Sequence, residues 1–213
     1  MGHAQHADLE ERLLHRMLFF TDAVFAIAMT LLVLELKPPE EPSGLTVDSM
    51  RSLIGHIGIF AMSFALIGVF WVAHLNTTRR LAHFDWPTAV VNLLFLLPVC
   101  LIPFAAAWFG ESLSASAAWA FYCWVLIATS ATNMVLVAVC YRGGGKLIAG
   151  GSPRGELLYR LSRASAPGVA FAIGLGLLAS GYVIAAHFCW PIIGLVFAVS
   201  EGLLKPKAQP RTA

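Results

Sequence analysis

Arg16 and Asp22 stand at the start of an apolar run that is otherwise typical of a membrane-spanning helix. An ionisable side chain in the hydrocarbon layer costs at least about 2.5–3.5 kcal/mol on insertion scales, so such a residue marks a structural or functional site and needs a partner. Two roles are open for the carboxylate of Asp22. It can serve in a proton relay or an ion-binding site, or it can lock its helix to neighbouring helices through hydrogen bonds.

Side chains on later apolar runs are expected at the same depth as Asp22. His74 lies near the end of the second run, Trp71 lies one turn before it, and Asn92 lies near the start of the third run. We expect Asp22 to accept hydrogen bonds from one or more of these side chains, with the hydroxyl of Thr21 beside it, because buried polar groups must be satisfied. The packing lock is favoured over the relay, since the second to fifth runs contain no acidic residue at mid-membrane depth.

The composition defines the class of protein in which these residues must act. Of the 213 residues, 58% are hydrophobic and only 12% are charged, and the mean hydropathy is +0.75. These values do not fit a water-facing globular surface. Segments long enough to cross a hydrocarbon core of about 30 Å as helices lie at roughly 17–36, 52–75, 88–109, 115–140, 164–186 and 189–204. We therefore predict an all-α integral membrane protein with six transmembrane helices in one domain, residues 17–204.

The distribution of Lys and Arg predicts the orientation of these segments. All but two of the 14 Lys and Arg residues lie before the first segment, in or beside the second and fourth connections, or in the tail. Because positive charge is retained on the cytoplasmic side, residues 1–16 and 205–213 are expected to be cytoplasmic. The glycine-rich connection at about 141–163 is expected to be a cytoplasmic linker, since it lacks the spacing of a phosphate-binding P-loop.

Several other functions find no support in the sequence. Four cysteines lie in or at the edges of apolar runs without C-x-x-C spacing, which argues against a disulfide framework and against a metal site. The net charge is only +2 and the cations sit at segment ends, so nucleic-acid binding is not indicated. No paired His or Asp constellation lies at mid-depth. We therefore predict neither an enzyme nor a bound cofactor.

The face of the first segment that points away from Asp22 is apolar. At 100° per residue, Ile27, Leu31 and Leu34 form one row, with the hydroxyl of Thr30 beside it. Periodicity alone makes such a row a lipid-facing or helix-packing surface in most proteins, and a pore lining in fewer of them.

The spacing Arg16-x-x-x-Phe20-Thr21-Asp22 resembles the R-x-x-x-F-S-D signature that opens the first helix of the transmembrane protein 175 family, which contains an endolysosomal potassium channel and its bacterial relatives. One departure is Thr21 in place of serine, which keeps the hydroxyl. The later segments also resemble the family, in Phe70-Trp71-x-x-His74 and in the run from Asn92 to Pro103. The polar network expected from these motifs comprises Arg16, Phe20, Thr21, Asp22, Trp71, His74 and Asn92.

The resemblance implies a potassium-permeable cation channel in the bacterial plasma membrane, in which the first helix of each subunit lines the central pore of a homotetramer. By position, the narrowest constriction falls on Ile27, with Leu31 and Leu34 as further apolar rings and Thr30 as a hydroxyl layer. The chain has no T-V-G-Y-G segment, so any preference for K⁺ would come from the cost of dehydration at the apolar ring. The alternative is a proton channel or a proton-coupled carrier that uses Asp22 and His74.

Overall fold

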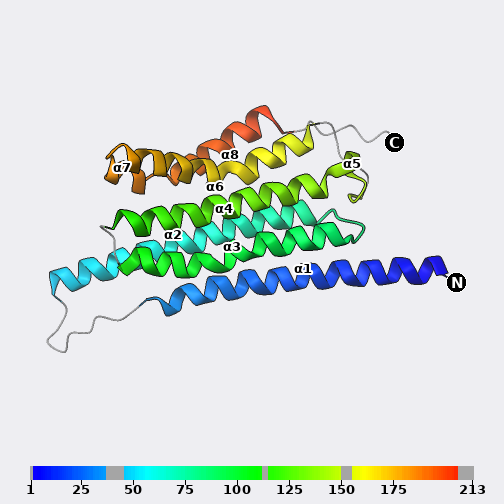
Figure 1. Ribbon diagram of the computed structural model, residues 1–213, viewed down its shortest axis with the longest axis horizontal. Helices are drawn as coiled ribbons and strands as arrows, with labels where there is room; N and C mark the ends of the chain where they lie inside the picture. The colour runs from blue at the N-terminus through cyan, green and yellow to red at the C-terminus, as the bar shows by residue number, and fades with distance from the viewer. Residues whose placement is uncertain (1, 37–45, 112–114, 150–154, 206–213) are drawn as a thin grey trace.

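The computed structural model describes residues 2–36, 46–111, 115–149 and 155–205. These residues form a helical bundle in which successive long helices run in opposite directions, with α1 at one edge and α6 and α8 at the opposite edge (Figure 1). The helices are α1 (Gly2–Leu34), α2 (Val47–Thr78), α3 (Trp86–Glu111), α4 (Ser116–Cys140), α5 (Arg142–Gly145), α6 (Glu156–Ala179), α7 (Val183–His187) and α8 (Pro191–Leu203).

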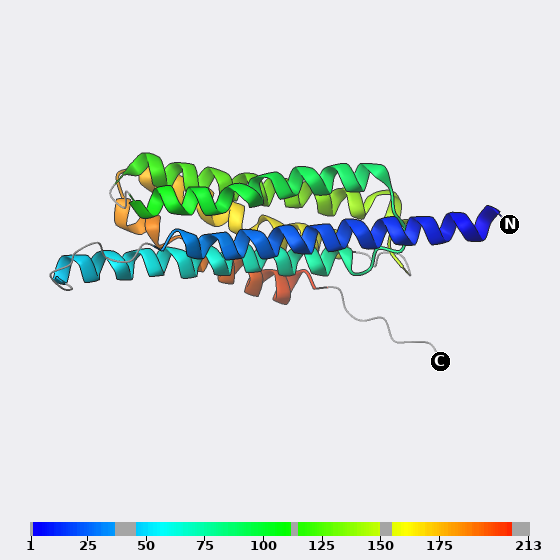
Figure 2. The same cartoon turned by 90° about the horizontal axis from the view of Figure 1, so that it is seen from below.

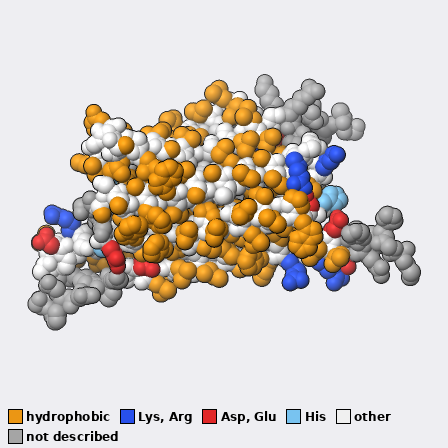
Figure 3. All heavy atoms as spheres, in the orientation of Figure 1, with side chains coloured by type: hydrophobic (Ala, Val, Ile, Leu, Met, Phe, Trp, Pro, Cys, Tyr) orange, Lys and Arg blue, Asp and Glu red, His pale blue; other side chains and the backbone are white. Residues whose placement is uncertain are grey.

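Five of the described helices are long and apolar enough to cross a membrane, namely α1 from Asp8 onward, α2, α3, α4 and α6. On the face shown in Figure 3, hydrophobic side chains cover the middle of the molecule, and charged side chains gather toward its two ends. The prediction of an all-helical protein with several membrane-spanning helices is therefore confirmed.

The expected sixth span, 189–204, is shorter than predicted. α8 has 13 residues, and a helix of that length extends only about 20 Å against about 30 Å of hydrocarbon. The five-residue helix α7 precedes it, and the break between the two lies at Phe188 to Trp190. α7 thus lies at the end of the predicted fifth span, and α8 lies within the predicted sixth span.

The expected fifth span, 164–186, is displaced toward the N-terminus in the structure. α6 begins at Glu156, inside the predicted linker 141–163, because arginine partners neutralise this carboxylate. α6 ends at Ala179 because Gly181 adopts a φ of 86°, and the N–H of Tyr182 returns to the carbonyl of Leu177 at 2.9 Å. Within the linker, residues 150–154 lie outside the described residues, as do 206–213 of the predicted tail.

Local polar contacts set where α2 and α3 begin. The hydroxyl of Thr46 accepts the backbone N–H of Ser49 at 3.1 Å, which caps the first turn of α2. The carboxylate of Asp85 accepts the backbone N–H of Thr88 at 3.1 Å and does the same for α3. The connections beyond these helices also touch, since Leu81 pairs with Ile148 across the second and fourth connections.

α1 lies along one side of the bundle and packs against α2 and α3 (Figure 2). One face of α1 is buried against these helices, at positions three, four and seven residues apart, as an amphipathic helix requires. This buried face consists of Leu14, Thr21, Phe25, Ala28 and Leu32. The remaining circumference of α1 is uncovered in the single chain.

Candidate functional site

A chain of buried hydrogen bonds joins α1, α2 and α3. The side-chain amide of Asn92 donates from Nδ2 to Thr21 Oγ1 at 2.7 Å, and its Oδ1 lies 2.9 Å from His74 Nε2. Because Oδ1 can only accept, Nε2 of His74 carries the proton in this contact. Thr21 in turn donates to the backbone carbonyl of Met17 at 2.9 Å. Thr21 Oγ1, both polar atoms of the Asn92 amide and His74 Nε2 each have a partner, although all three side chains are almost completely buried.

Aromatic rings surround the imidazole of His74. The ring of Phe95 stacks on it at a centroid distance of 5.7 Å and an interplanar angle of 6°, and Phe25 of α1 lies at 6.2 Å. These rings exclude water from the contact between His74 and Asn92. In a water-free site a hydrogen bond is stronger and an unsatisfied group costs more, so the contact defines the lateral position of α3 against α2.

Asp22 makes a separate contact with α2. Nε1 of Trp71 donates to Asp22 Oδ1 at 3.0 Å, while the rest of the carboxylate is exposed in the single chain. Of the three expected donors to Asp22, the structure brings Trp71 within hydrogen-bond distance. His74 and Asn92, the other expected donors, bond to each other and reach α1 through Thr21, so the hydroxyl beside the aspartate forms the main buried link.

Arg16 and Phe20 lie outside this hydrogen-bonded chain. Both side chains are exposed on α1, and within the part of the chain that the structure describes the guanidinium of Arg16 has no hydrogen bond or ion pair. The signature thus divides into two residues that bond to neighbouring helices, Thr21 and Asp22, and two that face away from the protomer.

The predicted apolar row on α1 is exposed. Ile27 is 57% exposed, Leu31 41% and Leu34 71%, on the side of α1 that faces away from α2 and α3. Thr30, also exposed, donates its hydroxyl to the backbone carbonyl of Ile27 at 2.9 Å. Hydrogen bonds thus anchor one side of α1 to α2 and α3, and the apolar row lies on the opposite side, where no part of the chain that the structure describes covers it.

A second polar cluster, at the end where α6 begins, was not predicted. The buried carboxylate of Glu156 accepts from Arg80 at 2.8 Å, from Arg160 at 2.9 Å and from the hydroxyl of Tyr141 at 3.1 Å. Arg160 also donates to the backbone carbonyl of Asn76 at 2.6 Å, which ties α6 to α2. Burial raises the pKa of the Tyr141 phenol, and Glu156 raises it further, so this hydroxyl stays a neutral donor. The i,i+4 spacing of Glu156 and Arg160 was the available sequence signal.

The described residues contain no candidate metal-binding site. Among them no group of three or more His, Cys, Asp and Glu side chains is arranged to hold a metal ion. The four cysteines are unpaired, and three of them are buried among apolar side chains.

The structure is that of a membrane protein with several spanning helices. A buried polar contact joins α1, α2 and α3, and α1 has an exposed apolar face. Residues 16–103 match the family model described as the endosomal/lysosomal potassium channel TMEM175. A potassium channel of Chamaesiphon minutus is 43% identical over 98 residues, which are 44% of this chain and 48% of the relative. The endosomal/lysosomal proton channel TMEM175 of Rattus norvegicus is 29% identical over 92 residues, which are 42% of this chain and 18% of the relative.

The similarity in structure extends over more of the chain. The crystal structure of a lysosomal potassium-selective channel TMEM175 homolog from Chamaesiphon minutus superposes with a TM-score of 0.67 at 26% identity, covering 90% of this chain and 96% of that one. Residues 16–103 are thus similar to the TMEM175 family, and the fold of the chain is similar to that of a TMEM175 homolog. The chain spans about half the length of two of the curated bacterial relatives that it matches.

Proposed function

We propose that this chain forms a potassium-permeable channel in which α1 from each of four identical subunits lines a central pore. The exposed apolar row of Ile27, Leu31 and Leu34 carries the proposal, because the same helix is anchored on its opposite side by buried hydrogen bonds. A single helix cannot enclose a pore, so the row needs further copies of the chain around it. The bacterial relative named a potassium channel supports K⁺ as the permeant ion.

The proposed mechanism is selection by dehydration at an apolar constriction. Ile27 forms the narrowest ring, Leu31 and Leu34 form further rings, and Thr30 offers a hydroxyl layer between them. An apolar ring supplies no ligands to replace the water shell of an ion, so it favours the ion that loses water at lower cost, which is K⁺ rather than Na⁺. The same rings close the path by dewetting, without a separate plug.

The orientation proposed from the charge distribution places both termini in the cytoplasm of a bacterial cell. In the described residues, Arg51 is the one Lys or Arg at the end of the bundle opposite the start of α1. We propose that α7 and α8 together make the sixth crossing. His187 of α7 stacks on Phe109 at the far end of α3, while Glu201 of α8 accepts from the hydroxyl of Tyr159 near the start of α6 at 2.6 Å. The segment 183–205 thus extends along the bundle from one end to the other.

Potassium flux into liposomes tests the channel. In the Ile27→Asn variant a polar side chain at the ring eases dehydration, so we expect higher K⁺ flux and weaker discrimination against Na⁺. Ile173→Asn is the matched control, because Ile173 is also exposed but lies on α6. Flux that is unchanged in Ile27→Asn, or equally changed in both variants, contradicts the proposed constriction. A monomeric mass for the active protein in detergent contradicts the pore itself.

A proton-conducting function is the second candidate, and the rat relative named a proton channel favours it. In that case Asp22 and His74 would carry protons. Asp22→Asn separates the candidates, because the amide oxygen still accepts from Trp71 but the side chain no longer titrates. Potassium flux that survives this substitution supports the channel, whereas loss of flux in an assembled, folded protein supports proton coupling.

A further inference from the structure

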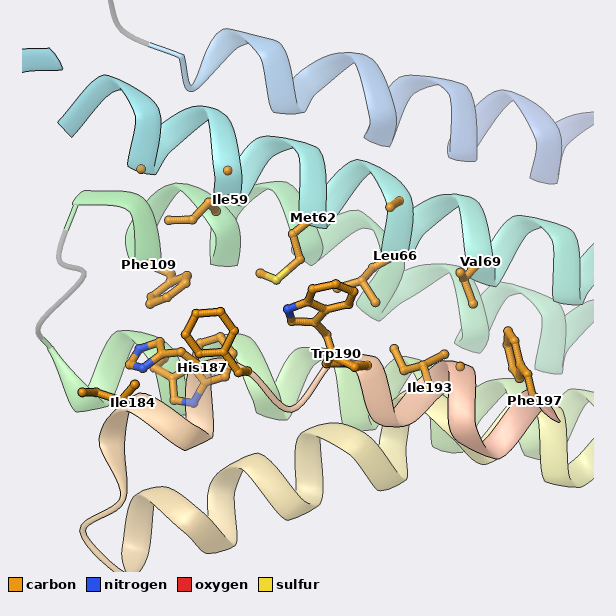
Figure 4. A pocket seen from close by; sticks show the side chains of 17 residues that line it. Ile59, Met62, Leu66, Val69, Phe109, Ile184, His187, Trp190, Ile193 and Phe197 are labelled. Atoms are coloured by element: carbon orange, nitrogen blue, oxygen red, sulfur yellow. The ribbon is translucent and has the colours of Figure 1, made fainter. Parts of the chain in front are cut away.

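A long groove separates α2 from α7 and α8. Its wider half has a volume of about 1120 Å³ and is lined almost entirely by apolar side chains. Phe109 and His187 lie at one end of this half, Trp190 extends into its middle, and Val69 and Phe197 lie at the other end (Figure 4).

A narrower half continues the groove toward the start of α6. This half has a volume of about 680 Å³ and shares Ala65, Val69 and Phe197 with the wider half, so the two form one continuous groove. The chemistry changes along its length from apolar to cationic. The basic side chains that line the narrower half are Arg79, Arg160, Arg163 and Lys205.

These cations exceed the carboxylates that face them. Arg160 pairs with Glu156, which also binds Arg80. Arg163 lies 3.6 Å from Glu201, and Lys205 pairs with the same carboxylate. Arg79 is exposed and has no hydrogen bond or ion pair in the described part of the chain. The narrower half therefore has unneutralised positive charge.

Two further features suit the groove to a ligand that has a polar end and an apolar end. The guanidinium of Arg163 lies 4.3 Å from the ring centroid of Phe197, at the junction of the two halves. Asn133 of α4 lines the narrower half with 0% exposure, and within the described residues neither its side-chain nitrogen nor its oxygen has a hydrogen-bond partner. A buried amide without partners is costly, and a polar group at the groove floor would satisfy it.

We infer that this groove binds an anionic phospholipid, with its phosphate headgroup between Arg79, Arg163 and Lys205 and an acyl chain along the apolar half. Basic pockets between transmembrane helices suit such headgroups, since each cation near the membrane surface contributes to attraction. From Arg79 to Val69 the groove follows α2 for about 15 Å, roughly the depth that one leaflet contributes to the hydrocarbon core, and it continues for about 21 Å more to Gly55. The groove is thus long enough for an acyl chain that passes the narrower half and ends in the apolar half.

Lipid binding is measured on the purified full-length protein by native mass spectrometry and by thermal unfolding. The probes are phosphatidylglycerol, phosphatidylcholine with the same acyl chains, and inorganic phosphate. We expect phosphatidylglycerol to be retained in preference to phosphatidylcholine and phosphate alone to give no stabilisation. Arg79→Gln should weaken phosphatidylglycerol binding about fivefold, and Arg79→Gln with Arg163→Gln about 25-fold. Arg51→Gln, at the opposite end of the bundle, is the matched control and should bind normally.

A second pair of variants tests the apolar half. A Cβ atom added at Gly194 meets no atom within 4 Å, so a side chain can start there, and Gly194→Phe should occupy part of the groove and reduce retention of both lipids. Gly202→Phe, equally unobstructed on the same helix but outside the groove, should not. Equal retention of the two lipids, stabilisation by phosphate alone, or normal binding by Gly194→Phe overturns the inference. So does an assembly in which a second copy of the chain fills the groove.

Discussion

Replacement of Asn92 by alanine tests the buried contact that positions α1. The substitution removes the donor to Thr21 on α1 and the acceptor for His74 on α2 in a single step. Thr21 keeps its own bond to the carbonyl of Met17, so the side chain left without a partner is the imidazole.

The expected cost follows from these contacts. His74 is 2% exposed, and a buried donor that loses its acceptor costs about 1–3 kcal/mol. The lost bond to Thr21 adds about 0.6 kcal/mol, the average measured for side-chain hydrogen bonds between membrane helices. We expect Asn92→Ala to lower the free energy of unfolding by about 1.6–3.6 kcal/mol.

Reversible unfolding in mixed micelles with increasing SDS measures this difference. The control is Thr132→Ala, because Thr132 is half-buried and its hydroxyl bonds only to carbonyls of its own helix; its effect should stay within about 0.5 kcal/mol. A double-mutant cycle of Asn92→Ala with Thr21→Val should give a coupling of about 0.6 kcal/mol. The reasoning is refuted if Asn92→Ala costs no more than the control, or if the two substitutions are strictly additive.

Two further predictions use the same unfolding assay. Glu156→Gln leaves the largely buried Arg160 without its counter-charge and should cost about 3 kcal/mol, whereas Glu201→Gln at the surface should have no measurable effect; equal effects would contradict the buried ion pair. Gly168→Ala places a Cβ atom 2.8 Å from Ser130 Oγ between α6 and α4 and should destabilise by about 1–3 kcal/mol. At Gly176 on the same helix an added Cβ atom meets no atom within 4 Å, so Gly176→Ala should stabilise the protein by up to about 1 kcal/mol. A loss of stability in Gly176→Ala would contradict the packing of α6 described above.

The first four spans were predictable because their sequences are uniformly apolar and their polar connections are short. The predicted limits 88–109 and 115–140 lie within two residues of α3 and α4 at each end. The later spans were not predictable in the same way. Hydropathy treats Glu156 as part of a polar loop, since it cannot register the neutralising Arg80 far away in the sequence, and it passes through Gly181, where the positive φ ends the helix.

The candidate site divides along a similar line. Depth in the membrane follows from the helical rise of 1.5 Å per residue, so the layer shared by Asp22, Trp71, His74 and Asn92 was predictable. The hydrogen bonds within that layer depend on the rotation and the lateral position of each helix. The depth of a residue in the membrane determines neither of these. For that reason the bond between Trp71 and Asp22 was one expected option among several, while Thr21 as the acceptor for Asn92 emerged only from the structure.

α1 has 33 residues and, as a continuous helix of about 50 Å, exceeds a hydrocarbon core of about 30 Å. Between Asp8 and Leu34 it contains neither glycine nor proline, so no residue in that stretch provides a hinge. A tilt of the part of α1 that projects beyond the bilayer is therefore transmitted to the part inside the bilayer. An antibody fragment or fused domain that tilts the projecting end would move Ile27 sideways without touching the membrane.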